Sequence, residues 1–400
     1  MAAATSPHIA PTVRDPRLDF YRGIAMFIIY ISHTPNNWWG DWIPGRFGFS
    51  DATEIFVFCS GMASAVAFGR SYDNRGWVLG TARVGFRVWQ IYWAHIALFF
   101  FCVMMLASWD LYGDFEKNYV NGLNLGRFLT DTDTLLVGLF TLTYVPNFFD
   151  ILPMYMVLLM LMPIVILLAR VNLWLVAVFC ILLWVLAQSR LLDALGLDIL
   201  HISLPAEPWS AREWFFNPFA WQLVFFTGFA FMKGWLPKPP INALLIAIAS
   251  GLLIAMFFAS HVAVREFDWG FPAAWRSANQ IWITKTEIGA IRFLHFLCLA
   301  YIAWVIAGEN GRRLIVTGTS ILHKIWAWII RQFTKVGQQS LAVFLVSIAL
   351  SRFSGFILDL IGDGALAVHT VSILGCATLL GVAYGAAWFK SQPWRKSATG

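Results

Sequence analysis

Long apolar segments separated by short polar connections run through nearly the whole chain. Ten of them are long enough to cross a bilayer as helices, because about 20 apolar residues span its hydrocarbon core. The predicted crossings lie near residues 18–35, 50–69, 82–108, 150–170, 172–190, 214–233, 241–261, 288–307, 338–358 and 366–388. The pattern predicts an all-α, polytopic membrane protein with about 10 transmembrane helices, in which residues 1–400 form a single integral-membrane domain.

One further apolar run, 135–148, is too short to cross and ends in a polar, proline-containing stretch with Pro146 and Asp150. We interpret it as re-entrant or interfacial, inside a connection that covers residues 109–149. Ten crossings then place both termini on the same side of the membrane.

Basic residues orient the chain. With a cytoplasmic N-terminus, the inner connections hold 18 Lys and Arg residues and the outer connections hold 8, while Arg292 and Arg352 lie within spans. This bias follows the positive-inside rule and predicts that both termini are cytoplasmic. Residues 1–16 are then an inner tail, 109–149 is periplasmic, and the first span, which carries Arg22, stays uncleaved.

Composition narrows the class of protein. Hydrophobic residues make up 59% of the chain, charged residues only 12%, and the mean hydropathy is +0.67, which excludes a soluble globular domain. Basic residues on the inner face explain the net charge of +6, so we expect no nucleic-acid partner. All five cysteines lie in apolar runs, and we expect neither disulfides nor a metal site.

A different pattern occupies residues 319–336, where His and Lys or Arg side chains interrupt an apolar stripe at helical spacing. It predicts an amphipathic helix that lies among membrane lipids at the inner interface, within a cytoplasmic segment 308–337. Help in binding an anionic cofactor is the alternative role.

The first span, from Arg17 to His33, carries its ionisable groups only near its ends. Arg22 and His33 are eleven residues apart, close to three helical turns, so both project from one face about 16 Å apart along the axis. Charged and titratable groups on one stripe of a membrane helix rarely face lipid. The stripe predicts a functional channel; the alternative is an Arg that snorkels to the headgroups and a His at the far end.

The next span opens with two carboxylates, Asp51 and Glu54, on the side of the membrane where His33 ends. A carboxylate beside an imidazole raises its basicity, as a general base for a hydroxyl requires. Capping of the second helix is the other role for both residues, and the two roles are compatible.

On the inner side, Arg83 and Arg87 lie four residues apart and share a helical face. Arginine binds phosphates through its planar fork, so the pair is a candidate phosphate site. Their alternative role is only to signal topology.

Several motifs resemble a known family. The LDFYRG start, the Arg22 and His33 pair and the EIFVFCSG opening of the second span resemble the transmembrane acyltransferase (acyltransferase-3) superfamily. Within it, ILPMYMVLLMLMP at 151–163, NPFAWQLVFFTGF at 217–229 and GQQSLAVFLVSIALS at 337–351 resemble OpgC proteins. These segments span nearly the whole chain.

The resemblance implies a protein of the bacterial inner membrane that transfers succinyl groups from succinyl-CoA to osmoregulated periplasmic glucans. In the same superfamily, the proposed catalytic His and nearby Asp of the lysosomal heparan-glucosaminide acetyltransferase resemble His33 and Asp51. The implied site has His33 as general base with Asp51 or Glu54, and Arg22, Arg83 and Arg87 as ligands of the acyl-CoA. Direct transfer and an acyl-enzyme both remain open.

Two other functions fit parts of the pattern. A proton-coupled transporter or flippase would also place His and Arg inside the membrane. Alternatively, the acceptor of the acyl group is another polysaccharide or a lipid.

Overall fold

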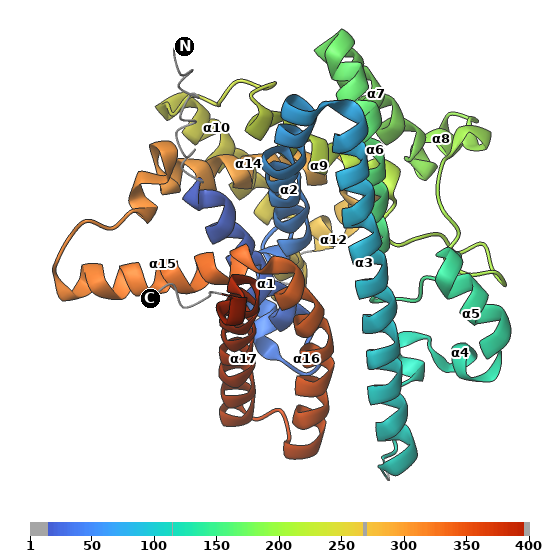
Figure 1. The fold of residues 1–400 in the computed structure, drawn as a ribbon. Helices are drawn as coiled ribbons and strands as arrows, with labels where there is room; N and C mark the ends of the chain where they lie inside the picture. Colours follow the sequence, from blue (N-terminus) through green and yellow to red (C-terminus); the bar gives the residue numbers. More distant parts are fainter. Residues whose placement is uncertain (1–14, 114, 267–269, 396–400) are drawn as a thin grey trace.

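The computed structural model describes residues 15–113, 115–266 and 270–395, and most of the predicted tail 1–16 lies outside them. Each predicted span contains one long helix of a bundle (Figure 1). These helices are α1 (Pro16–His33), α2 (Ala52–Ser64), α3 (Arg70–Tyr112), α6 (Ile151–Val171), α7 (Leu173–Leu186), α9 (Pro218–Lys233), α10 (Ala243–Phe257), α14 (Ala290–Ala307), α16 (Ser340–Ile361) and α17 (Ala365–Ser391). The predicted all-α class is confirmed.

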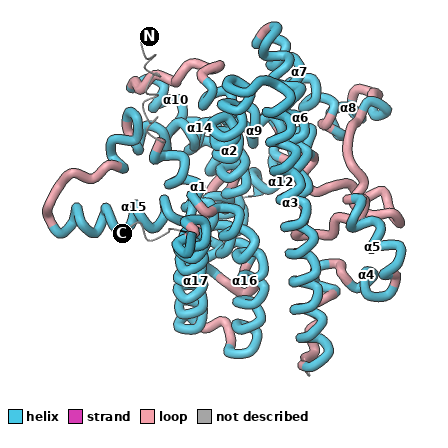
Figure 2. Tube along the Cα trace, in the orientation of Figure 1, coloured by secondary structure: helices cyan, strands magenta, loops and turns pink. Residues whose placement is uncertain are grey.

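Shorter elements connect the long helices. The short helices are α4 (Gly126–Thr130), α5 (Thr132–Thr141), α8 (Ser189–Ala194), α11 (His261–Glu266), α12 (Gly270–Ala278) and α13 (Gln280–Ile283), and the longer α15 (Ile321–Gln338) is the predicted amphipathic helix. Single turns are η1 (Trp38–Trp42), η2 (Pro44–Arg46), η3 (Ala65–Gly69), η4 (Asn121–Leu123), η5 (Asp198–Leu200), η6 (Glu309–Leu314) and η7 (Pro393–Arg395). In the described ranges, extended pairing is limited to an isolated bridge between Pro205 and Glu213, and Figure 2 shows helices and loops throughout.

Six stretches of the described chain are long and apolar enough to cross a membrane. One of them, Ala52–Tyr112, contains both α2 and α3, and a bend at Gly76 inside α3 turns the longer part of α3 back in the direction opposite to α2 (Figure 1). Helices α7 and α9 fall outside the six because they have only 14 and 16 residues. A multi-pass membrane protein is therefore confirmed, whereas ten crossings and cytoplasmic termini stay predictions.

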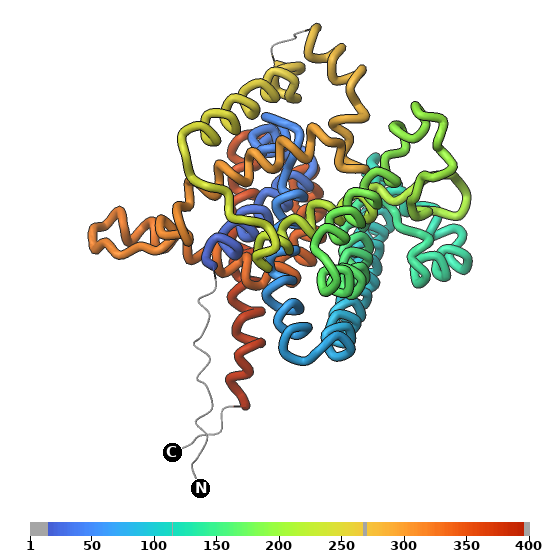
Figure 3. Tube along the Cα trace, turned by 90° about the horizontal axis from the view of Figure 1, so that it is seen from above, coloured from blue at the N-terminus to red at the C-terminus, as the bar shows by residue number. Residues whose placement is uncertain are grey.

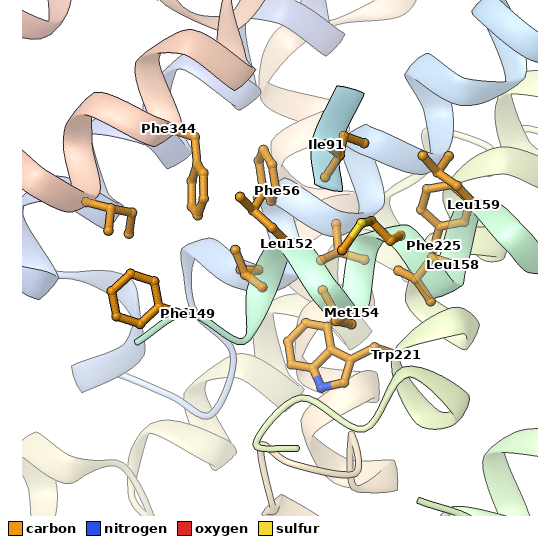
Figure 4. Close-up of a cluster of buried hydrophobic side chains, with 14 of the residues drawn as sticks. Phe56, Ile91, Phe149, Leu152, Met154, Leu158, Leu159, Trp221, Phe225 and Phe344 are labelled. Atoms are coloured by element: carbon orange, nitrogen blue, oxygen red, sulfur yellow. The ribbon is translucent and has the colours of Figure 1, made fainter. Parts of the chain in front are cut away.

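The apolar core forms where α2, α3, α6, α9 and α16 meet (Figure 4). Phe56 of α2 stacks on Phe344 of α16 with ring centroids 5.7 Å apart, and Trp221 of α9 is completely buried. Full burial of a large apolar side chain contributes about 1.5–3 kcal/mol, so this cluster helps to fix α2 and α16, both of which pack against the first span.

Helix α15 projects sideways from the bundle, as Figures 1 and 3 show, and only its C-terminal half is buried against α1. Two glycines permit this crossing. A Cβ atom on Gly23 would lie 1.9 Å from the carbonyl oxygen of Phe333, and one on Gly337 would lie 1.8 Å from that of Asp19. The backbones of α1 and α15 therefore touch, and α15 is anchored to the span that carries Arg22 and His33.

Candidate active site

Helices α1 and α16 pack side by side in parallel, and the candidate site lies along this pair. Arg22 of α1 donates a hydrogen bond to the hydroxyl of Ser340 at the start of α16. Further along both helices, the hydroxyls of Tyr30 and Ser354 are 2.8 Å apart. Because these contacts advance along both helices in the same direction, the pair joins the Arg22 level to the His33 level.

The three arginines predicted to bind the cofactor line one cavity of about 400 Å³. Arg22 enters it from α1, Arg83 and Arg87 from α3, and Lys390 from the end of α17. Arg83 donates to the hydroxyl of Ser71, and Arg87 donates to Gln90 Oε1 at 3.1 Å. Four cationic side chains around one cavity form an arrangement that can bind phosphate groups.

His33 ends α1, eleven residues beyond Arg22. Its Nδ1 atom lies 2.8 Å from the carbonyl oxygen of Ile29, one turn earlier. Since a carbonyl only accepts, Nδ1 carries the proton and the lone pair is on Nε2. The ring of Phe148 meets the imidazole edge to face, with centroids 5.2 Å apart. A backbone group thus orients His33 with Nε2 as the basic atom.

The predicted carboxylates form the start of α2. Asp51 caps the helix by accepting from the backbone N–H of Thr53 at 2.7 Å, and Glu54 accepts from the backbone N–H of Asp51 at 2.8 Å. This reciprocal capping box satisfies backbone donors that a helix start otherwise leaves unpaired. The helix-capping role that the sequence indicated for Asp51 and Glu54 is therefore present.

Both carboxylates also pair with cations from a distant part of the chain. Lys285 Nζ lies 2.6 Å from Asp51 Oδ2, and Arg292 of α14 donates to Glu54 Oε1 and lies 3.6 Å from Asp51. Glu54 is completely buried. Among the described contacts, neither carboxylate hydrogen-bonds to His33, although Asp51 is close enough to interact with it electrostatically.

Sequence reasoning missed four side chains that shape this region. Lys285 and Arg292 hold the carboxylates, Phe148 contacts His33, and the guanidinium carbon of Arg352 lies 3.9 Å from the centroid of the Phe148 ring. Two of these four carried a signal, because Arg292 and Arg352 are charges inside predicted spans and such residues mark functional regions of membrane proteins.

A polar cavity of about 730 Å³ opens beside the C-terminal end of α1. Asp51 lines it together with residues from the connection between α1 and α2 and from α11, among them Asn36, Trp38, Asp41 and His261. Hydroxyl, amide, carboxylate and indole groups of this kind can hydrogen-bond to sugars and stack on them. The cavity therefore suits a polar acceptor next to Asp51, and Ser32 and Thr34, the chain neighbours of His33, also line it.

The described residues contain no group of three or more His, Cys, Asp or Glu side chains that could hold a metal ion. The arrangement offers an imidazole whose Nε2 can accept a proton and a cationic cavity at the Arg22 level. The imidazole is suited to acid–base chemistry and the cavity to binding an anion.

Comparison with known proteins supplies the family. The model of the OpgC protein family matches residues 14–391, nearly the entire chain. No curated protein and no solved structure matches. The match includes α1 with Arg22 and His33, the start of α2 and the whole of α16. This chain belongs to the OpgC protein family.

Proposed function

We propose that this protein is a membrane acyltransferase that moves a succinyl group from cytoplasmic succinyl-CoA to hydroxyl groups of periplasmic glucans. One observation carries the proposal: the Arg22, Arg83 and Arg87 cavity and the His33 imidazole occupy opposite ends of the α1 and α16 pair. The rise between Arg22 and His33 is about 16 Å. A CoA thioester has the same polarity, with phosphates at one end and a reactive carbonyl at the other.

The proposed topology has ten crossings in the bacterial inner membrane. It places 1–16, 308–337 and the C-terminus in the cytoplasm and 109–149 in the periplasm. The 18-to-8 division of Lys and Arg residues between the two sides supports it. On this topology, α15 lies against the lipids of the inner leaflet, the arginine cavity opens to the cytoplasm, and the polar cavity beside Asp51 opens to the periplasm.

In the proposed reaction, the inner arginines bind the CoA phosphates and the pantetheine arm extends along α1 towards His33. Nε2 of His33 takes the proton of a glucan hydroxyl while the oxygen of that hydroxyl attacks the thioester carbonyl. The C–S bond then breaks, and the CoA thiolate receives the proton from His33. The succinyl ester of the glucan and free CoA are the products.

Asp51 and Glu54 support this step from a fixed position. The negative charge of Asp51 favours the imidazolium that forms on His33 and offsets part of the opposing effect of the Lys285 and Arg352 charges, which also act on this ring. Lys285 and Arg292 hold the two carboxylates at the start of α2, where they also cap the helix. No metal takes part in this proposal.

Mass spectrometry tests the proposed reaction. Purified protein in lipid nanodiscs, supplied with succinyl-CoA and a periplasmic glucan, should add succinyl esters to the glucan, and protein with His33→Ala should not. If the folded parent protein neither binds CoA thioesters nor acylates glucans, the proposal is wrong and proton-coupled transport becomes the better explanation of the buried His and Arg. Binding of CoA with acylation of another polysaccharide or a lipid would retain the reaction and change the acceptor.

A further inference from the structure

Arg352 is a guanidinium inside a transmembrane helix for which the described chain supplies no counter-ion. Its Nε atom is buried without a hydrogen-bond partner, and no carboxylate of the described residues forms an ion pair with it. Arg292, the other arginine within a predicted span, pairs with both Glu54 and Asp51. An uncompensated charge at this depth is costly, and such residues mark ligand or ion pathways in membrane proteins.

Phe148 connects Arg352 to the candidate base. The Phe148 ring meets the His33 ring edge to face, with centroids 5.2 Å apart. The guanidinium carbon of Arg352 lies 3.9 Å from the centroid of the same Phe148 ring. Because both distances end at the same ring, the guanidinium carbon lies at most about 9 Å from the centre of the imidazole. His33 and Arg352 also interact electrostatically.

The contact with Phe148 leaves the guanidinium able to bind an anion. The guanidinium carbon lies over the Phe148 ring, which offers no carboxylate or carbonyl acceptor, and the N–H donors of a guanidinium project in its own plane. That plane matches the two oxygens of a carboxylate, which accept two parallel hydrogen bonds. Arg352 therefore presents a carboxylate-binding edge close to the place where the acyl group is transferred.

We propose that Arg352 binds the free carboxylate of the transferred acyl group and so selects dicarboxylic acyl donors over uncharged ones. This inference rests on the proposed acyl transfer at His33. The two carbonyl carbons of a four-carbon dicarboxylic acyl group are three bonds, or about 4 Å, apart. Such a group fits between an attacked carbonyl beside His33 and the guanidinium within about 9 Å of it.

Stabilisation of the oxyanion on the attacked carbonyl is the competing role for Arg352. That charge exists only during the reaction, so the guanidinium would stay without a counter-ion while the substrate is bound. The carboxylate of a dicarboxylic acyl group supplies a full negative charge throughout. The two roles differ in one measurable respect: an oxyanion forms with every acyl donor, whereas the terminal carboxylate is present only in some.

The experiment compares succinyl-CoA with butyryl-CoA, which has the same number of acyl carbons and a methyl group in place of the carboxylate. The parent protein should prefer succinyl-CoA in kcat/KM, and Arg352→Gln should lower the succinyl-to-butyryl ratio by about 10- to 100-fold, the usual effect of one charge-assisted pair. Arg352→Lys, which keeps the charge without the planar fork, should give an intermediate ratio. Arg170→Gln, at the exposed end of α6, is the control and should keep the parent ratio.

Equal losses with both donors would assign Arg352 to the oxyanion and overturn the proposal, as would an unchanged ratio. If Arg352→Gln does not fold, kcat/KM of the parent protein with the two donors still tests the proposal. Equal or better use of butyryl-CoA by the parent protein would contradict selection of the carboxylate. Failure of the parent protein to transfer either group would refute acyl transfer itself and this inference with it. Transfer with an unaltered ratio would refute only the role of Arg352.

Discussion

Lys285 Nζ lies 2.6 Å from Asp51 Oδ2, although the two residues are 234 positions apart in the chain. This contact engages one of the two carboxylates, Asp51 and Glu54, that the sequence suggested as partners of His33. His33 is oriented instead by the Ile29 carbonyl, and Asp51 acts on it through space. The catalytic contribution proposed for Asp51 is therefore electrostatic, and Lys285 keeps that charge in position.

We expect Arg292→Gln to lower the free energy of unfolding by about 3–5 kcal/mol, because it leaves the buried Glu54 charge without its partner. Thermal unfolding of the detergent-solubilised protein measures the effect. The double variant with Glu54→Gln should recover part of the loss. The control is Lys233→Gln, which breaks the exposed pair with Asp73 and should cost under about 1 kcal/mol. Equal losses in both single variants would contradict the buried-pair argument.

Replacement of His33 by Ala should reduce kcat for acyl transfer by about 10²- to 10⁴-fold without unfolding the protein, because Nε2 is the proposed proton acceptor. Steady-state kinetics on monodisperse protein measures this loss. His323→Ala, on the projecting helix α15, is the matched control and should retain the parent kcat. A kcat within about tenfold of the parent value in His33→Ala would remove His33 from the role of base.

The arginine cavity makes a separate prediction about affinity. Arg22→Ala, Arg83→Ala and Arg87→Ala should each weaken succinyl-CoA binding by about 1.5–3 kcal/mol, because each removes a charge-assisted phosphate contact. Calorimetry should show nearly parental affinity for His33→Ala. Arg75→Ala, on the same helix α3 but not among the residues that line the cavity, should also bind normally. Parental affinity in all three cavity variants would exclude this cavity as the CoA site.

Reporter fusions test the orientation. A fusion after Gly400 should report a cytoplasmic location, and fusions within 109–149 should report a periplasmic one, as the distribution of Lys and Arg residues requires. With a cytoplasmic N-terminus, a periplasmic C-terminus would require an odd number of crossings, so the 135–148 run would have to cross the membrane and the proposed site would have to be redrawn.

Glu207 makes stability depend on pH. Burial raises its pKa, but hydrogen bonds from Ser210 and from Arg212, at 2.9 Å, outweigh that effect and hold the pKa below its ordinary value. A lowered folded-state pKa stabilises the protein above the ordinary glutamate pKa, and this contribution is lost as the pH falls through the lower folded-state value. Glu207→Gln should therefore cost about 1 kcal/mol at neutral pH.

Melting temperatures of parent and Glu207→Gln protein should converge as the pH falls below the ordinary glutamate pKa, about 4.3. A difference that is constant between neutral pH and about pH 3 would show that the ion pair of Glu207 with Arg212 does not contribute.

The local sequence pattern was enough to predict the helices and which residues lie together on one helix. Each predicted span contains a long helix, and Arg22 and His33 do share α1, because helical spacing alone fixes both. The capping role of Asp51 and Glu54 was likewise readable, since a capping box needs only residues three positions apart.

Contacts between helices that are distant in the chain could not be predicted from the sequence pattern. The pairing of Lys285 with Asp51 and the contact of Arg352 with Phe148 depend on how α14 and α16 pack around α1, which no local spacing encodes. Ten crossings stay a prediction for a related reason: α7 and α9 are short, and length alone does not decide whether a helix flanked by protein crosses the bilayer.

The parallel packing of α1 and α16 restricts how the gene can change in length. Deleting one residue between Arg22 and His33 would turn the imidazole by about 100° relative to Arg22, away from Phe148, while Arg22 could keep its contact with Ser340. A deletion in α16 between Ser340 and Arg352 would displace the guanidinium in the same way. Insertions and deletions of single residues in either segment are therefore incompatible with the site, because Phe148 lies on neither helix, so both helices are expected to keep their lengths during evolution.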